Sequence, residues 1–215
     1  MKWRHALRPA LILVGLMWLS HLSQLVLQQH WVHLGILPRH TEGLVGILTA
    51  PLIHGSIQHL ISNTFPMIFL MVVLDLAYPR SARYAFVLVY IGTGVGMWLF
   101  ARTNYHIGAS GVVYGLVAFL FWTGLFRRNI RSIALSLAIL FLYSGYIWGV
   151  FPNKPGISWD GHLIGALVGI LVAYLLRHRI EPEKKPRYTF LEEESPETYY
   201  FDRDVFDRDS SEKEG

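Results

Sequence analysis

The residues best suited to chemistry in this sequence are a serine, a histidine and two further polar side chains, Ser110, His162, His59 and Asn63. A serine hydroxyl becomes a nucleophile when a neighbouring base takes its proton, and histidine is the usual base near neutral pH. The amide of Asn63 and the ring N–H of His59 are donors of the kind that stabilise an oxyanion. These residue types predict attack by Ser110 on a carbonyl group, with His162 as the base.

The elements that must position these residues are predicted to be membrane-spanning helices. The chain has 215 residues, of which 53% are hydrophobic and 16% charged, and this balance is typical of a membrane protein. A span needs about 20 mostly apolar residues. Six segments qualify, at roughly 9–28, 59–78, 82–101, 110–126, 130–151 and 161–176. We therefore expect an all-α membrane protein built as a six-transmembrane helical bundle.

The charges predict orientation and domain organisation. Residues 1–180 hold three acidic residues against thirteen Lys and Arg, whereas 181–215 holds the other twelve acidic residues. The basic residues gather at alternate ends of the spans, which predicts cytoplasmic termini by the positive-inside rule and gives no reason to expect a nucleic-acid partner. We expect one six-span domain over 1–180, an interfacial outer loop over 29–58, and a disordered, charged cytoplasmic tail over 181–215.

The spans place the four polar residues at one depth. His59 and Asn63 lie one helical turn apart at the outer end of the second span, Ser110 begins the fourth, and His162 lies in the first turn of the sixth. All three spans run inward, so the four side chains meet near the outer leaflet, where buried polar groups indicate a function. Asp160, two residues before His162, points to another side of a helix. We expect a Ser-His dyad.

Glycines flank both predicted catalytic residues. Gly108 and Gly111 allow close approach of another chain to Ser110. Gly165 and Gly169 form a G-x-x-x-G face below His162, which favours close packing against the span that starts at Ser110. A hydrogen bond between Ser110 and His162 requires such an approach.

These motifs, taken in order, resemble those of the rhomboid intramembrane serine proteases over roughly residues 8–180: His59-x-x-x-Asn63, Gly108-Ala109-Ser110-Gly111 with Tyr114 after it, and His162 before Gly165-x-x-x-Gly169. The resemblance implies the minimal six-span bacterial form, in an inner membrane, with a water-filled cavity open to the outside. It implies hydrolysis of a peptide bond in or near a transmembrane segment. The substrates would be single-span or multi-span membrane proteins in the lipid bilayer.

The resemblance also implies individual roles. Ser110 would be the nucleophile, His162 the general base, and His59 and Asn63 the oxyanion-hole donors. Tyr114 would pack its ring on His162. No metal or cofactor is expected for this chemistry.

Two further features bear on the resemblance. His54 matches a histidine common in the family's loop, and we expect it to be structural. The outer loop lacks the Trp-Arg pair found in many members, because its Trp31 and Arg39 are far apart, and this leaves the fold of that loop open.

Other classes fit the sequence less well. A zinc intramembrane protease needs H-E-x-x-H, which is absent, and an aspartyl protease needs a second intramembrane aspartate beside Asp75. A small transporter should show related halves with helices broken at mid-membrane. A catalytically inactive rhomboid-like protein that binds transmembrane helices is the remaining alternative, although such a relative would normally have lost Ser110 or His162.

Overall fold

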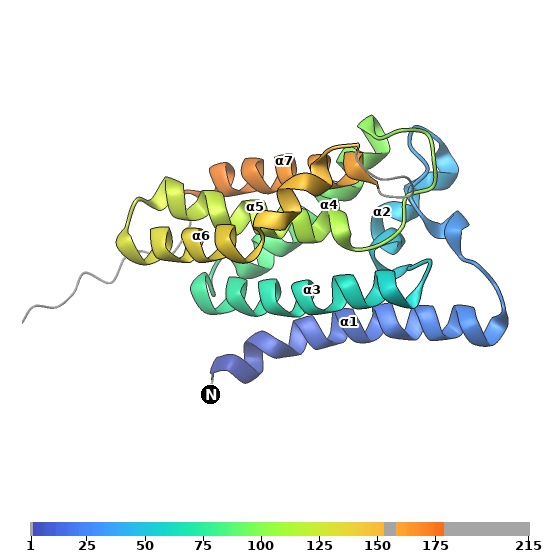
Figure 1. Ribbon diagram of the computed structural model, residues 1–215, viewed down its shortest axis with the longest axis horizontal. Helices are drawn as coiled ribbons and strands as arrows, with labels where there is room; N and C mark the ends of the chain where they lie inside the picture. The colour runs from blue at the N-terminus through green and yellow to red at the C-terminus, as the bar shows by residue number, and fades with distance from the viewer. Residues whose placement is uncertain (1, 153–157, 179–215) are drawn as a thin grey trace, which may run out of the picture. The chain divides into compact units, whose positions relative to one another are not determined.

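The computed structural model describes residues 2–152 and 158–178, with side chains from His5 onward. This part of the chain is helical and contains no β-strand beyond one isolated bridge, so the predicted all-α class is confirmed. Figure 1 shows the main helices: α1 (Lys2–Leu27), α3 (Ile57–Ala77), α4 (Ala82–Phe100), α5 (Ser110–Arg127), α6 (Ile130–Leu142) and α7 (Trp159–Leu176). Residues Met1–Glu181 form one compact unit. The predicted tail, 181–215, lies outside the described residues.

Five of these helices are long and apolar enough to cross a membrane: His5–Leu27, Ile57–Ala77, Ala82–Phe100, Ser110–Arg127 and Trp159–Leu176. The predicted span over 130–151 is instead divided. The helix α6 ends at Leu142 and the 3-10 helix η4 (Ser144–Val150) follows at an angle of 64°. Counted as one bent span, the pair brings the total to six among the described residues.

The composition of η4 explains the bend. Gly145 and Gly149 weaken helical structure by about 1 kcal/mol each relative to alanine. The Ser144 hydroxyl donates a hydrogen bond to the Phe141 carbonyl oxygen at 3.1 Å, which competes with the regular helical pattern. The mean hydropathy of the segment shows only that it is apolar, so the bend was not predicted.

The helix α5 is the centre of the bundle. It packs against α7, α6, α4 and α3, while α1 packs along α3 (Figure 1). Its Val112, Leu116 and Phe119 are fully or almost fully buried, as are Leu60 and Leu70 of α3. Ser110 thus begins a helix that is enclosed by four others.

The contact between α5 and α7 depends on glycine. A Cβ atom added at Gly165 would overlap the carbonyl oxygen of Gly111, and one added at Gly169 would overlap that of Gly115. The two backbones therefore touch directly, in the first and second turns of α5. Glycines are the residues that allow helices to approach this closely.

The outer loop between α1 and α3 is folded although the Trp-Arg pair is missing. It contains short helical turns: η1 (Val32–Leu34), η2 (Thr41–Leu44), α2 (Gly46–Thr49) and η3 (Ala50–Leu52). Ile36 and His106 exchange two backbone hydrogen bonds of 2.9 Å, and the Arg39 guanidinium donates to the Ala101 carbonyl oxygen at 2.8 Å. The loop is thus attached to the segment that leads from α4 to Ser110.

Candidate active site

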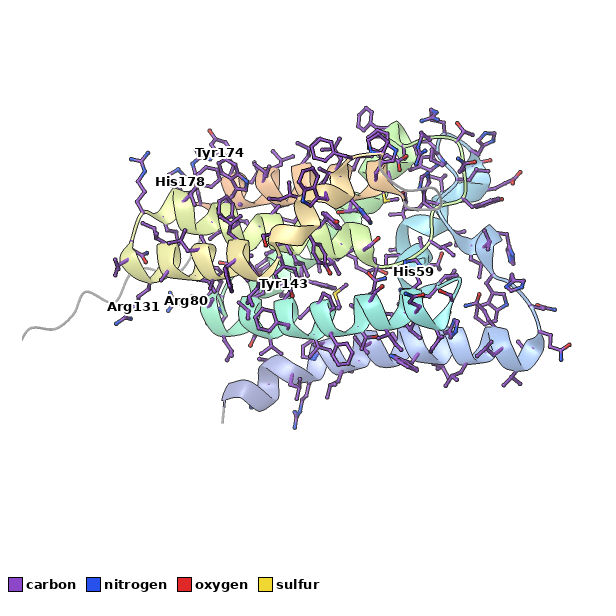
Figure 2. All side chains as sticks on the ribbon, in the orientation of Figure 1. His59, Arg80, Arg131, Tyr143, Tyr174 and His178 are labelled. Atoms are coloured by element: carbon purple, nitrogen blue, oxygen red, sulfur yellow. The ribbon has the colours of Figure 1, made fainter. Side chains whose placement is uncertain are left out.

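The starts of three helices deliver the candidate catalytic side chains. The helix α3 begins where the Ser56 hydroxyl accepts a hydrogen bond from the His59 backbone N–H at 3.1 Å, an N-terminal cap. Figure 2 shows His59 at the end of α3 nearest α2. Ser110 is the first residue of α5, and His162 is the fourth residue of α7. Each side chain is therefore fixed by a helix start and not by a long free loop.

The Ser110 hydroxyl and the His162 ring are in direct contact. His162 Nε2 lies 2.9 Å from Ser110 Oγ, and His162 Nδ1 lies 2.9 Å from the Gly149 carbonyl oxygen. A carbonyl oxygen only accepts hydrogen bonds, so Nδ1 carries the hydrogen of the neutral ring. The lone pair is then on Nε2, facing the serine, which is the tautomer that can accept the hydroxyl proton.

Aromatic rings hold the plane of the imidazole. The Tyr114 ring stacks on His162 with centroids 4.1 Å apart and planes 7° from parallel, and Tyr146 packs against Tyr114 with centroids 4.9 Å apart. A Cβ atom at Gly149 would overlap the Tyr114 hydroxyl. Gly149 therefore both supplies the carbonyl that orients His162 and leaves room for the ring that covers it.

Gly108 brings the His59 ring close to the segment before Ser110. Its φ of +102° lies in the region that favours glycine. A Cβ atom there would lie 2.5 Å from His59 Nε2, and the Gly108 N–H donates to the Ala50 carbonyl oxygen at 2.9 Å. The imidazole of His59 thus rests against bare backbone two residues from Ser110.

Three hydrogen-bond donors face the same space as the Ser110 hydroxyl. Asn63 is buried, and one hydrogen of its amide group is donated to the His59 carbonyl oxygen at 2.8 Å. The second amide hydrogen does not take part in that bond. His59 offers a ring nitrogen. The Ser110 backbone N–H precedes the first hydrogen bond of α5, from Val113 N to Ala109 O, so it has no partner within the helix.

These groups line one cavity of about 720 Å³, together with Tyr114, Tyr146 and residues of the loop before Ser110. The cavity is large enough to admit an extended peptide segment and water. Within residues 2–152 and 158–178, no group of three or more His, Asp or Glu side chains is placed to hold a metal ion. The chemistry that this cavity can supply is nucleophilic attack by a hydroxyl beside a neutral base.

His54 lies behind His59. Their ring centroids are 4.9 Å apart with planes at 67°, and only 1% of His54 is exposed. Burial, followed by the charge of His59, lowers the pKa of His54 to about 3. His54 is therefore neutral across the physiological range and adds no charge beside the oxyanion donors. The His54 carbonyl oxygen lies 3.1 Å from His21 Nδ1, which links this part of the site to α1.

Two parts of the site were not predicted from the sequence. The group that orients His162 is the main-chain carbonyl of Gly149. Every residue has such a group, so the sequence does not reveal its role, and Gly149 could only be interpreted as a helix-packing residue. Asp160 is buried and forms an ion pair with the exposed Arg102, and no sequence motif marks this pair.

Comparisons with known proteins show the family to which this chain belongs. A Rhomboid domain model matches residues 41–179. Rv1337 of Mycobacterium tuberculosis is 40% identical over 162 residues, which cover 71% of this chain and 66% of that protein. ML1171 of Mycobacterium leprae is 34% identical over 197 residues, which cover 87% of this chain and 76% of that protein.

"Putative rhomboid protease YdcA" of Bacillus subtilis is 28% identical over 134 residues, which cover 60% of this chain and 65% of that protein. The chain thus spans just under two thirds of the length of Rv1337 and of YdcA. The family match includes every candidate residue from His59 to His162 and the helices α3 to α7. With its apolar helices and this match over most of its length, the chain is an integral membrane protein that belongs to the rhomboid family, whose members are generally serine proteases.

Proposed function

We propose that this protein is a serine endopeptidase that cleaves transmembrane segments of membrane proteins by a Ser-His dyad near the outer leaflet. Ser110 is the nucleophile and His162 the general base. The observation that carries the proposal is the 2.9 Å contact between His162 Nε2 and Ser110 Oγ, with Nδ1 held by the Gly149 carbonyl oxygen. A serine activated by a base that is itself oriented by a third group is the arrangement that nucleophilic catalysis requires.

The first half of the reaction forms an acyl-enzyme. Ser110 Oγ attacks the substrate carbonyl carbon while its proton passes to His162 Nε2. The resulting imidazolium keeps its Nδ1 hydrogen bond to the Gly149 carbonyl oxygen, whose partial negative charge stabilises it. The oxyanion accepts hydrogen bonds from the Ser110 N–H, His59 and Asn63. The carbon–nitrogen bond then breaks as His162 Nε2 returns the proton to the leaving amine.

The second half regenerates the enzyme. A water molecule in the cavity gives one proton to His162 Nε2, and its oxygen attacks the acyl carbon. The carbon–oxygen bond to Ser110 breaks, the new carboxylic acid leaves, and Ser110 Oγ takes the proton back from His162. Water must therefore reach Ser110 from the outer side of the membrane.

The surroundings of Ser110 favour a substrate with small side chains at the cut. A transmembrane helix shields its peptide bonds with its own hydrogen bonds and side chains, so it must unwind before Ser110 can attack. The unwound segment would lie against the backbone around Gly108 and the ring of His59, where little space is left. Mapping of cleavage products should show small residues next to the cut; efficient cleavage only after bulky aromatic residues would contradict this.

The remaining parts of the proposal concern placement. Basic residues such as Arg80, Arg83 and Arg131 lie at the ends of α3, α4 and α6 opposite to the catalytic side chains. This favours cytoplasmic termini in a bacterial inner membrane, with the active site toward the outside. A protease domain over 1–180 and a cytoplasmic tail over 181–215 belong to the same proposal. Substrates would be single-span or multi-span proteins of the same bilayer.

The decisive experiment is labelling of the purified protein with a fluorophosphonate probe, because it requires no knowledge of the substrate. Wild type should be labelled, while Ser110→Ala and His162→Ala should lose labelling. Ser20→Ala, on α1, is the matched control and should be labelled like wild type. Folded wild type that does not react would favour the alternative, a catalytically inactive rhomboid-like protein that binds transmembrane helices.

A further inference from the structure

A polar network with a buried centre, Asp160 and His106, joins the segment before Ser110 to the segment before His162. Its members are Arg102 and His106, in the loop that leads from α4 to α5, and Ser158 and Asp160, at the start of α7. None of them contacts the Ser110 hydroxyl or the His162 ring. The network instead connects the two chain segments that carry these groups.

Asp160 is the centre of this network. Only 6% of the residue is exposed. Its Oδ2 accepts hydrogen bonds from the Arg102 backbone N–H at 2.9 Å and Nε at 3.2 Å, and its Oδ1 accepts from Arg102 Nη2 at 3.3 Å and Ser158 Oγ at 3.0 Å. A buried carboxylate is tolerated when it is paired and hydrogen-bonded in this way. Because one donor is a backbone N–H, the carboxylate fixes the main chain of the loop and not only a side chain.

The hydrogen bonds of His106 define its protonation. His106 is 5% exposed, its Nε2 lies 2.8 Å from the Arg102 carbonyl oxygen, and its Nδ1 lies 2.7 Å from Ser158 Oγ. The carbonyl only accepts, so Nε2 carries a hydrogen. The Asp160 carboxylate only accepts hydrogen bonds, so the single hydrogen of the Ser158 hydroxyl is donated to Asp160. Ser158 Oγ must then accept from His106, and this requires a second hydrogen, on His106 Nδ1. All contacts are satisfied together only when His106 is doubly protonated.

The charged groups around this ring act in both directions. Among the described residues, the ionisable groups come from three elements: Asp160 and His162 from α7, Arg102 and Tyr105 from the loop itself, and His59 from α3 across the cavity. Asp160 Oδ2, 4.0 Å from His106 Nε2, favours the charged ring. The Arg102 guanidinium opposes it but is paired with Asp160 and lies over the Trp159 ring at 5.3 Å.

We propose that Asp160 is a positioning residue for the Ser110–His162 pair, acting through Ser158 and a doubly protonated His106 that together hold the loop before Ser110 against the start of α7. This inference rests on the proposed function. His106 lies four residues before Ser110, and Asp160 lies two residues before His162. Both partners of the 2.9 Å catalytic contact are thus anchored to one network.

A simpler role would be stabilisation alone. An acidic residue in the first turn of a helix is favourable, and so is an ion pair with Arg102. The two roles differ at Ser158. Ser158→Ala keeps the charge of Asp160 and its bonds to Arg102, but it removes the link to His106. A purely stabilising role predicts little change in this variant, whereas the positioning role predicts a loss of reactivity.

The test measures the maximal inactivation rate, kinact, and the half-saturating concentration, KI, for a fluorophosphonate with the full chain, across about pH 5 to pH 9. Asp160→Asn and Ser158→Ala are compared with wild type, and Asp75→Asn, on α3, is the matched control. We expect kinact to fall by about ten- to a hundredfold in both variants with KI unchanged, as for a displaced reacting pair. Ser158→Ala should keep the thermal unfolding temperature of wild type.

A variant of His106 itself separates the two roles further. His106→Gln removes the ring that joins the Arg102 carbonyl oxygen to Ser158 Oγ. Its kinact should fall as in Ser158→Ala, with His33→Gln as the control that keeps the wild-type value. A His106→Gln variant with wild-type kinact would overturn the role of His106.

The remaining outcomes are distinct. Variants that react with the kinact and pH profile of wild type would overturn the positioning role and leave the proposed protease intact. Wild type that does not react at Ser110 would overturn both. If Asp160→Asn does not fold, Ser158→Ala decides the question. A loss of reactivity that equals the fraction of unfolded protein would count against the proposal.

Discussion

Among residues 2–152 and 158–178, Gly108 is the glycine at which a positive φ and a lack of space both exclude a side chain. Its φ of +102° strains any residue with a side chain, by about 1–3 kcal/mol, and a Cβ atom would press on His59. Gly108→Ala should therefore reduce fluorophosphonate labelling at least about tenfold, since a displaced reacting group costs that much. Gly15→Ala in α1, where an added Cβ meets nothing within 4 Å, should label like wild type. Full labelling of Gly108→Ala would show that the His59 ring can move without consequence.

The buried His54 predicts a loss of stability in acid. Burial lowers its pKa from 6.5 to about 3 in the folded protein, so between these values the unfolded chain binds a proton that the folded chain does not. Stability should thus be unaffected by His54 above about pH 6.5 and fall by about 1 kcal/mol per pH unit as the pH drops toward 3. Unfolding measured across this range should show a shallower decline for His54→Asn than for wild type. Exposed His33, replaced by Gln, should leave the slope unchanged.

Gly149 and Tyr114 can be tested as a pair. Gly149→Ala places a methyl group on the Tyr114 hydroxyl, which should displace η4 and take the carbonyl oxygen away from His162 Nδ1. Labelling should fall by about tenfold or more. Adding Tyr114→Phe removes the hydroxyl and should restore part of the reactivity. Equal labelling of the single and double variants would show that the effect of Gly149→Ala does not arise from contact with the Tyr114 hydroxyl.

Depth in the membrane is the variable from which the sequence predicts the site. Span direction puts Ser110 and His162 at one level, and the structure places His162 Nε2 2.9 Å from Ser110 Oγ, while their catalytic roles stay a prediction. The sequence could not predict the role of the Gly149 carbonyl group, because every residue has a backbone acceptor. It also could not predict the contacts of His106. These form only when its loop folds onto Ile36 and when Ser158, 52 residues further along the chain, comes close.

At the scale of helices, the contact between α5 and α7 sets the distance between the Ser110 hydroxyl and the His162 ring. Gly165→Ala adds a methyl group where the Gly111 carbonyl oxygen lies, so the helices must separate. We expect loss of labelling together with a lower free energy of unfolding, by about 1–3 kcal/mol as for an overpacked core. Gly145→Ala in η4, where an added Cβ has no neighbour within 4 Å, should be tolerated. A Gly165→Ala variant with wild-type labelling would show that the α5–α7 distance is adjustable.

The helices also show which features of the fold a sequence can predict. The spans expected at 82–101 and 110–126 match α4 and α5 within one residue at each end, because apolar runs there stop at polar or glycine-containing turns. The α7 helix begins two residues before the expected 161, which puts Asp160 inside it. The segment 130–151 was predicted as one span because apolarity is continuous through the bend between α6 and η4.

At the scale of the whole molecule, the orientation in the membrane can be tested without background, since the chain has no cysteine. Asn104→Cys lies in the loop before Ser110, and Arg83→Cys lies in the first turn of α4, at the opposite end of the helices; both positions are exposed. A membrane-impermeant maleimide applied to spheroplasts should label Asn104→Cys and spare Arg83→Cys until the membrane is opened. The reverse pattern would place the active site toward the cytoplasm.

The carbonyl group that orients His162 has a consequence for how this site tolerates change. In a catalytic triad the third group is a side chain, and one codon change can delete it. Here the third group is main chain, so no substitution removes it. Its position depends on the path of η4, which many residues set jointly. A substitution such as Gly149→Ala can displace this carbonyl group but cannot delete it. In the proposed site, the side chains whose own removal deletes a reacting group are therefore those of Ser110 and His162.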